Sequence, residues 1–352
     1  GDSMTVKNNV EMFWKHFQSE ENTIIQSLKD KSYKQLQESI EKMDDEAMEK
    51  FGAHFFVEDS SEYLELVFDP GPNKTSQYLT RYCVEQAPQA IRSKWILNDV
   101  LPPMSQKAIE AQVKIKDQEY YLNDFFVFYT VDTKNKMIAC DVYNPSYSLI
   151  DNTERKKEMS MYLVELAIGE NAYEAYLSKV DFIDQPDDQR DFCNLIEFYE
   201  KIDEIVKKEK WPTYEHPTDI YSVYRPIKEI ADDSLRKDMK YIFTTHPLLI
   251  EESISQQHDV VSDLKAKDGE FGYIYYLNPF HSKEDAILRQ NLSKQLDEQM
   301  TKIGAAKVIG GAIGKSYAYI DLIIYDTKSF KKALQNLQGQ LSKNLAFHYQ
   351  PF

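Results

Sequence analysis

The chain has 352 residues, of which 42% are hydrophobic and 13% aromatic, and its formal net charge is −16. This length exceeds what one ordinary core needs and predicts about two domains. The hydrophobic content excludes wholesale disorder, and no apolar run approaches the ~20 residues that cross a bilayer, so no membrane partner is expected.

The three cysteines, Cys83, Cys140 and Cys193, lie far apart in the sequence and are odd in number. Their spacing matches no metal or redox pair and is typical of reduced thiols in a reducing compartment. No charged-then-apolar leader follows Met4, and we interpret the tripeptide before it as a remnant of tag removal. These features predict a cytoplasmic protein.

The negative charge is concentrated early in the chain. Residues 1–200 hold 21 Lys and Arg against 37 Asp and Glu, whereas residues 201–352 hold 21 of each. An acidic surface repels nucleic acid and favours basic partners. The charge therefore indicates either a basic protein partner or a role in solubility alone.

Hydrophobic periodicity and turn residues predict the elements of the first half. In chain order they are helices around 10–17 and 33–43, strands over 53–58 and 62–69, a helix over 74–87, a strand over 94–101, a meander of strands over 112–143, a helix over 153–168 capped by Gly169, and a strand over 177–183. An acidic stretch over 184–191 leads into an amphipathic helix that starts at Phe192 and includes Val206.

The second half follows a simpler order. We expect strands over 220–224 and 239–244 with a short helix between them, a helix over 248–264, then a strand over 271–278, a helix over 282–302, strands over 306–311 and 317–326, a helix over 329–341 and a strand over 345–349. From residue 271 onward this is the β-α-β-β-α-β order of the ferredoxin-like plait.

The predicted fold class is therefore α+β with two domains. The first, over 4–183, is an acidic mixed α+β domain with an antiparallel sheet. A linker and connecting helix over 184–217 hold the domain boundary. The second domain covers 218–352, with the plait over about 270–352.

Several segments of residues 10–183 resemble a bacterial domain of unknown function. They are Phe13-Trp14-Lys15-His16-Phe17, Leu64-Glu65-Leu66-Val67, Ala87-Pro88, Trp95 in the following strand, and the turn from Leu163 to Gly169-Glu170. The chain departs from the pattern at residues 98–102, where that family continues with Phe-Arg-Pro. The strand at Tyr319-Ile320-Asp321-Leu322 resembles a second uncharacterised domain. The resemblance implies a bacterial two-domain family with no known activity.

The glycine-rich segment from Ile309 to Ser316 is superficially similar to a phosphate-binding loop. That motif needs glycine where Ile309 stands, and it needs a helix after Lys315 to direct its N-terminus at phosphate. A strand is predicted there instead. We therefore interpret the glycines as part of a tight turn between two strands.

The stretch from Lys315 to Leu322 also resembles the third-strand signature of the RNA recognition motif, with departures at Ser316 and Leu322. The segment from Ile274 to Asn278 partly fits the first-strand signature of the same motif. The strand order agrees with that fold, so single-stranded RNA is a candidate partner.

Side chains alternate along a strand, so Tyr317, Tyr319 and Asp321 are predicted on one face of the sheet. Tyr275 of the first strand is predicted beside Tyr319, where exposed rings would stack on bases. The domain has no net positive charge, and Asp321 lies on this face, which favours docking of the first domain or of a partner protein over RNA. These four residues are the candidate binding site.

Catalytic and metal-binding motifs are missing from the sequence. It has no Gly-x-Ser-x-Gly, His-Glu-x-x-His or Cys-x-x-Cys pattern. The acidic stretch from Asp184 to Asp191 lacks the glycine and closing glutamate of a calcium loop. We therefore assign no catalytic residue, no metal and no cofactor.

The leading hypothesis is a non-enzymatic protein-binding or regulatory protein, of which an immunity-type protein that neutralises a basic toxin is one concrete version. Its motives are the acidic first domain, the aromatic sheet face and the missing catalytic motifs. Single-stranded RNA binding and an enzyme of unrecognised type are the alternatives.

Overall fold

The computed structural model describes residues 4–59, 62–104, 112–115, 118–225, 233–341 and 343–352. Helices account for 49% and strands for 25% of the structure, and the strands form several sheets, which agrees with the predicted α+β class. Within these residues, no helix combines the length and apolar character needed to cross a membrane.

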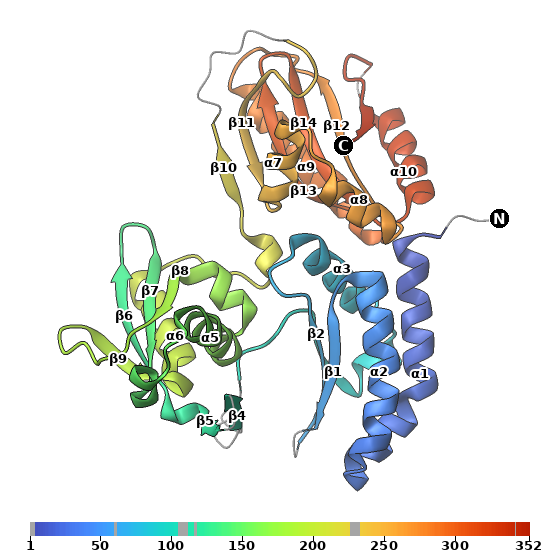
Figure 1. Cartoon of the computed structure of the whole chain (residues 1–352). Coiled ribbons are helices and arrows are strands. Elements are labelled where there is room, and N and C mark those ends of the chain that lie inside the picture. Colours follow the sequence, from blue (N-terminus) through green and yellow to red (C-terminus); the bar gives the residue numbers. More distant parts are fainter. Residues whose placement is uncertain (1–3, 60–61, 105–111, 116–117, 226–232, 342) are drawn as a thin grey trace. The chain divides into compact units, whose positions relative to one another are not determined.

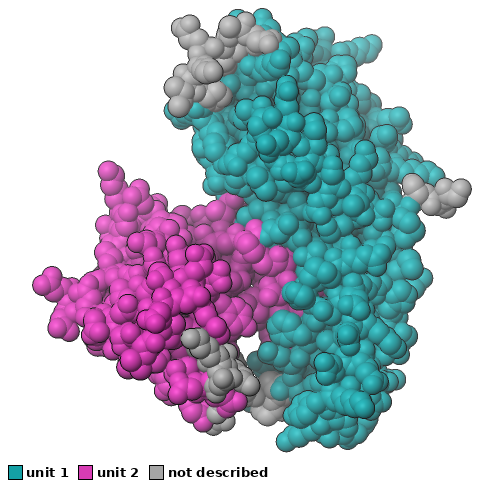
Figure 2. Space-filling view, in the orientation of Figure 1, with its two compact units in different colours: residues 1–64, 73–96, 221–352 teal, residues 65–72, 97–220 magenta. Residues whose placement is uncertain are grey.

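The chain divides into two compact units, each discontinuous in sequence (Figure 2). Unit 1 consists of residues 1–64, 73–96 and 221–352, and unit 2 of residues 65–72 and 97–220. The contiguous domains expected over 4–183 and 218–352 differ from this division. The segment expected to be a linker, 184–217, belongs to unit 2, because side chains such as Phe198, Ile202 and Trp211 are part of its core.

The N-terminal part of unit 1 is helical. Its elements are α1 (Val6–Asp30), α2 (Tyr33–Phe51), β1 (His54–Asp59), α3 (Lys74–Glu85) and α4 (Gln89–Arg92). Two further strands, β2 (Leu64–Asp69) and β3 (Trp95–Asn98), contain the points at which the chain passes from one unit to the other. Thr5 caps α1 by accepting a hydrogen bond from the Asn8 amide. Aromatic rings meet edge to face in the core, with Phe13 5.2 Å from Trp14 and Phe17 5.4 Å from Trp95.

The C-terminal part of unit 1 is a six-stranded sheet with four helices (Figure 1). Its elements are β10 (Ser222–Tyr224), β11 (Met239–Thr244), α7 (Pro247–Ser255), α8 (Asp259–Ala266), β12 (Glu270–Leu277), α9 (Glu284–Lys302), β13 (Ala306–Gly314), β14 (Tyr317–Ile324), α10 (Thr327–Gln340) and β15 (His348–Pro351). The strand order is β10-β11-β13-β14-β12-β15, and every neighbouring pair is antiparallel.

Side chains cover both faces of this sheet. One face packs apolar residues of β14, such as Ile320 and Leu322, against Leu296 of α9 and Phe330 of α10. On the other face, Tyr319 packs with Ile250 of α7 in a second cluster. The helix expected over 248–264 is two helices, because Gln256 adopts a left-handed conformation that ends α7.

Polar contacts join the two parts of unit 1. The Tyr82 hydroxyl donates to the Gly304 carbonyl at 2.7 Å, and Thr75 Oγ1 lies 2.8 Å from Nε2 of the buried His246. Buried hydrogen bonds of this kind are costly to leave unmade. The N-terminal helices therefore share a unit with residues more than 150 positions away in the sequence.

Unit 2 is a four-stranded sheet with two long helices on it. Its elements are the strand pair β4 (Gln112–Ile115) and β5 (Gln118–Tyr121), β6 (Phe126–Asp132), β7 (Met137–Tyr143), α5 (Thr153–Tyr176), β8 (Leu177–Phe182), β9 (Asp191–Asn194) and α6 (Phe198–Glu209), with short 3-10 helices at Leu122–Asp124, Pro145–Leu149, Leu195–Glu197 and Pro217–Asp219. The order is β8-β7-β6-β9, and only β7 and β8 are parallel among these pairs.

One helix boundary of unit 2 differs from the prediction, and one agrees with it. The helix expected from Phe192 begins only at Phe198, because Phe192 lies in β9 and stacks on Phe128 of β6 at 5.3 Å. As predicted, the regular helix from Thr153 is interrupted at Gly169, whose backbone dihedrals are not helical, and a second helical stretch of α5 then runs on to Tyr176.

Candidate functional site

The predicted aromatic face is present in the strand register but is not open. Tyr275 lies opposite Tyr319, and Asp321 lies opposite Tyr273. Tyr319 and Asp321 are 0% exposed, whereas Tyr275 and Tyr317 are half-buried. Two of the four candidate residues are therefore inaccessible to any partner.

The segment before β11 covers Tyr319 and Asp321. Arg236 forms a two-pronged ion pair with Asp321, at 2.7 and 3.3 Å, and its guanidinium lies 5.0 Å from the centre of the Tyr319 ring. The Tyr319 hydroxyl donates to Asp238 at 2.5 Å. Burial and this hydrogen bond raise the pKa of Tyr319. These residues form a buried polar network that holds residues 236–238 on the sheet.

Tyr275 and Tyr317 retain partial exposure but already contact other rings. Tyr275 meets Tyr317 edge to face at 5.6 Å and stacks on His348 at 5.2 Å. A base would need a free ring face of the kind that an RNA-binding sheet presents. Together with the buried Tyr319, this arrangement provides no open platform of the kind expected from the sequence.

The cysteine thiols do not form a reactive site. Cys83, Cys140 and Cys193 are all buried and without disulfide bonds. Burial raises the pKa of each thiol, in the case of Cys193 to about 12. A thiol kept protonated is a poor nucleophile. Within the described part of the chain, no group of three or more His, Cys, Asp or Glu residues is arranged to hold a metal ion.

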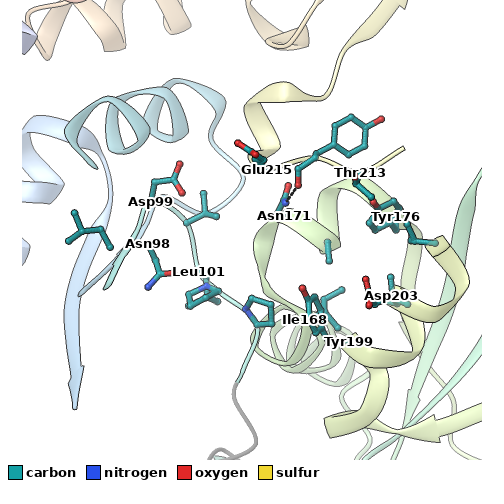
Figure 3. Close-up of a pocket in the computed structure, with 18 residues that line it drawn as sticks. Asn98, Asp99, Leu101, Ile168, Asn171, Tyr176, Tyr199, Asp203, Thr213 and Glu215 are labelled. Atoms are coloured by element: carbon teal, nitrogen blue, oxygen red, sulfur yellow. Dashed lines mark hydrogen bonds between the residues drawn. The ribbon is translucent and has the colours of Figure 1, made fainter. Parts of the chain in front are cut away.

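The strongest candidate site is a pocket of about 330 Å³ within unit 2 (Figure 3). Four segments line it, namely residues 97–103 at the end of β3 and in the loop after it, the second half of α5, one side of α6, and residues 213–215. Figure 3 shows Asn171 and Ile168 of α5 between the loop that carries Asp99 and the segment that carries Asp203. All of these residues belong to the same compact unit.

The lining combines carboxylates with tyrosines. Asp99, Asp203 and Glu215 supply the negative charge, and no lysine, arginine or histidine is among the lining residues. Tyr176, Tyr199 and Tyr214 supply aromatic surface, and the remainder is mostly aliphatic. A pocket of this composition favours a positively charged guest, because carboxylates and ring faces both attract cations.

The kink of α5 shapes one wall of the pocket. Gly169 has φ of 80°, a left-handed value, and a Cβ atom there would lie 2.7 Å from the Pro103 nitrogen. The Glu170 amide beyond the kink donates to the Leu101 carbonyl at 2.9 Å. The lining loop is thereby fixed to the helix through backbone contacts.

Asn171 carries an unused hydrogen-bond acceptor at this wall. Its Nδ2 donates to the Tyr214 carbonyl at 2.6 Å, which holds residues 213–215 against α5. Its Oδ1 is buried, and no hydrogen-bond partner for this atom occurs in the structure as described. Such an atom in a native protein calls for an explanation. A bound N–H donor would supply one.

The acidic side chains of the lining differ in how they are held. Asp99 accepts from Nδ1 of His216 at 2.7 Å, and both side chains are mostly buried. Asp203 pairs with Lys207 at 2.8 Å on the exposed side of α6. Glu215 is exposed. The pocket lining thus has one largely buried, hydrogen-bonded carboxylate, Asp99, and two exposed ones, of which Asp203 is ion-paired with Lys207.

A buried carboxyl group lies directly behind the pocket wall. Glu170 is 2% exposed and neighbours Glu165 and Glu174. Burial, with the hydrogen bonds and charge of these two residues, raises the pKa of Glu170 well above its ordinary value. Glu170 is therefore neutral at pH 7 and adds no charge to the site.

Comparisons with protein-family models, with curated proteins and with solved structures found no match for this chain. The resemblance to a bacterial two-domain family thus stays a prediction.

Sequence reasoning missed the pocket because its walls come from four separated segments. The residue types gave a weak signal, since acidic residues and tyrosines are dense between 165 and 215. Gly169-Glu170 belongs to the sequence pattern that resembles the bacterial domain, but only the fold shows that this kink contacts the loop after β3.

Proposed function

We propose that the chain is a non-enzymatic binding protein whose unit 2 pocket receives a positively charged group of a basic protein partner. The observation that carries this proposal is the pocket lining, with three carboxylates, three tyrosines and no cationic side chain. A lysine or arginine side chain is of the size and charge that such a pocket accommodates.

The charge of the surrounding unit supports a basic partner. Residues 65–72 and 97–220 contain 14 Lys and Arg against 27 Asp and Glu, a net charge of −13 of the total −16. A field of one sign around a pocket raises the association rate of an oppositely charged partner. An immunity-type protein that neutralises a basic toxin is one concrete form of this proposal.

The atoms at the pocket wall support a guest that donates hydrogen bonds. The buried Oδ1 of Asn171 has no hydrogen-bond partner among the described residues, and Asp203 and Glu215 are exposed carboxylates of the same lining. An ammonium or guanidinium group brings several N–H donors on one cation. The same group would satisfy Asn171 and neutralise a carboxylate.

We also propose the finer fold assignment for the end of unit 1. The neighbouring order β15-β12-β14-β13, with every pair antiparallel and with α9 and α10 packed on one face, supports a ferredoxin-like plait over about 270–352. The buried Tyr319 and Asp321 favour a structural role for the other face of this plait over RNA binding.

The test is calorimetric titration of the full chain with a short lysine- and arginine-rich peptide, at two salt concentrations. The pocket variant is Asp203→Asn with Glu215→Gln. The matched control is Asp188→Asn with Glu209→Gln, which removes the same charge from exposed positions of unit 2 outside the pocket lining. We expect the pocket variant to bind at least about tenfold more weakly than the wild type, and the control to lose less than about threefold.

Equal losses in the two variants would show that the peptide responds only to net charge, and would overturn the pocket proposal. A single-stranded RNA of similar length serves as a competitor. If RNA bound and displaced the peptide, the protein-binding reading would give way to the nucleic-acid alternative.

A further inference from the structure

The two faces of the four-stranded sheet in unit 2 differ in what they contact. On one face, side chains such as Val127 and Cys140 form the core of the unit together with α5 and α6. Side chains alternate along a strand, so the intervening residues lie on the opposite face. We call this the outer face, and its residues are Phe126, Phe128, Thr130, Asp132, Met137, Ala139, Asp141, Tyr143, Lys179, Asp181, Phe192 and Asn194. None of them belongs to the core of unit 2.

Aromatic rings occupy one part of the outer face. Phe192 of β9 stacks on Phe128 of β6 with ring centres 5.3 Å apart, and Phe128 meets Tyr143 of β7 edge to face at 6.2 Å. Phe126 lies opposite Tyr143 in the strand register. Phe128 is 5% exposed, whereas the Phe192 ring that stacks on it is 61% exposed. A large exposed ring on a packed aromatic cluster is typical of a residue that anchors a protein–protein interface.

An arginine fixes the edge of this cluster. Arg190, which directly precedes β9, forms an ion pair with Asp141 of β7 at 2.5 Å and donates to the Phe128 carbonyl at 3.2 Å. These contacts join the start of β9 to the two central strands of the sheet. The Phe192 ring is therefore held in position before a partner arrives, which lowers the conformational entropy that binding must overcome.

Charge narrows the class of partner that fits the outer face. Unit 2 has a net charge of −13, which repels nucleic acid and anionic membrane surfaces. A second copy of the chain would bring the same negative charge, which opposes self-association through unit 2. Residues 177–194 form both edge strands of the sheet and the loop between them, and they contain five aspartates against Lys179 and Arg190. A positively charged protein is the partner that complements this charge.

We propose that the outer face binds an amphipathic, positively charged segment of a protein, with its apolar side chains against Phe192 and its lysines or arginines toward the acidic edge segment 177–194. An apolar centre with a charged rim is the usual arrangement of such interfaces. The inference rests on the proposed function only in taking the partner to be basic. The surface itself is separate from the pocket, because none of its residues lines that pocket.

The experiment titrates the full chain with two peptides of equal length and charge, one of lysine and leucine and the other of lysine and serine. We expect the leucine peptide to bind the wild type at least about tenfold more tightly, because burial of a few methylene groups is sufficient for that difference. Phe192→Ala should remove most of this preference. Tyr162→Ala is the matched control, since Tyr162 is a 55% exposed aromatic residue of α5 outside the outer face, and it should change the preference less than about twofold.

The pocket variant Asp203→Asn with Glu215→Gln separates this inference from the proposed function. It is expected to weaken the binding of both peptides by the same factor and to leave the preference for leucine unchanged. If this variant bound like the wild type, the pocket would be wrong and the outer face would stand. If Phe192→Ala kept the full preference, the outer face would be wrong and the pocket would stand.

Phe192→Trp gives a direct readout at the site and retains a ring that stacks on Phe128. The three tryptophans of the wild type are buried, so the emission that this variant adds reports on residue 192. We expect the leucine peptide to shift that added emission to shorter wavelength and the serine peptide to leave it unchanged. This variant decides the question if Phe192→Ala fails to fold.

Three results would overturn the proposal. They are a wild type that does not prefer the leucine peptide, equal losses in Phe192→Ala and Tyr162→Ala, and an unchanged emission of Phe192→Trp. Sedimentation of the wild type tests the remaining occupant. Self-association that Phe192→Ala abolishes would assign the outer face to a second copy of the chain instead of a basic partner.

Discussion

The two units differ in where they carry charge. Unit 2 has a net charge of −13 in 132 residues, whereas unit 1 has −3 in 220 residues, with 28 Lys and Arg against 31 Asp and Glu. Unit 2 also contains the pocket whose lining includes the three carboxylates Asp99, Asp203 and Glu215. Unit 1, by contrast, has a buried ion pair between Arg236 and Asp321 of β14.

This difference shows that charge serves two purposes in one chain. Exposed carboxylates have little effect on the stability of the fold, and their charge acts at a distance. They are therefore suited to the recognition of a partner. Buried charges are expensive unless paired, so they define a unique packing or mark a ligand site. In unit 1, Arg236 is paired with the Asp321 carboxylate, whereas Nη1 of Arg289 is buried without a hydrogen bond among the described residues.

The largest expected effect breaks the buried pair of unit 1. Asp321→Asn leaves the Arg236 charge uncompensated inside the sheet cluster, and we expect a loss of about 3–5 kcal/mol in the free energy of unfolding. Urea denaturation measures it. The control is Asp233→Asn, which removes an exposed partner of Lys315 and should cost less than about 1 kcal/mol. Similar losses in the free energy of unfolding for both variants would contradict the conclusion that an ion pair matters more for stability when it is buried.

A glycine substitution tests the kink that shapes the pocket of unit 2. Gly169→Ala places a Cβ atom at a left-handed φ and against the backbone at Pro103, so we expect a loss of about 2–4 kcal/mol. Gly339 of α10 has open space around it, and Gly339→Ala should stabilise by about 0.5–1 kcal/mol. If a side chain at residue 169 strains the kink, the denaturant midpoint falls in Gly169→Ala and rises in Gly339→Ala.

Acid is expected to weaken unit 1 through His246. Burial, followed by the nearby Lys74, lowers the pKa of His246 to about 4, and its Nδ1 accepts from the Leu249 amide. The folded state binds this proton less well than the unfolded state, so the stability it contributes is present above pH 6.5 and is lost as the pH falls toward 4. Between pH 7 and pH 5 we expect a loss of about 2 kcal/mol.

His246→Asn keeps a side chain able to cap α7 while removing the titration. The variant should therefore show a smaller loss of stability over the same pH range, even if its stability at pH 7 is lower. An unchanged slope would exclude His246 as the source of the acid sensitivity.

Alkali is expected to weaken unit 2 through Glu170, with the opposite sign. Its raised pKa means that the folded state holds a proton that the unfolded state releases near the ordinary glutamate value of about 4.3. The stability it contributes is complete below that value and is lost as the pH rises. We expect Glu170→Gln, which stays neutral, to gain at least about 1 kcal/mol relative to the wild type between pH 5 and pH 8. Equal pH profiles for the two proteins would contradict a shifted carboxyl group.

The elements with strong periodicity could be predicted from the sequence. The helices around Phe13 and Met43 and the strand around Ile320 lie where the patterns placed them, because spacing along a helix or strand is a local property of the backbone. The segment from Phe192 was misplaced, because its apolar residues fit a strand followed by a helix as well as one long helix.

The glycines after Ile309 are a second case in which one sequence pattern fits two different structures. The sequence predicts a turn there, yet Gly310 and Gly311 lie inside β13. Added Cβ atoms at these positions would lie 2.4 Å from the carbonyl oxygens of Phe243 and Tyr319, respectively. A glycine required by close packing and a glycine required by a turn look alike in a sequence.

The mixed helix and strand content, the excess of acid and the shared face of Tyr317, Tyr319 and Asp321 follow from the order of the residues alone. Three features become visible only in the folded chain: Arg236 covers that face, the N-terminal helices join the C-terminal sheet in one unit, and four separated segments form a pocket. The physical reason is that alternation and charge belong to neighbouring residues, whereas burial depends on side chains brought together from distant parts of the chain.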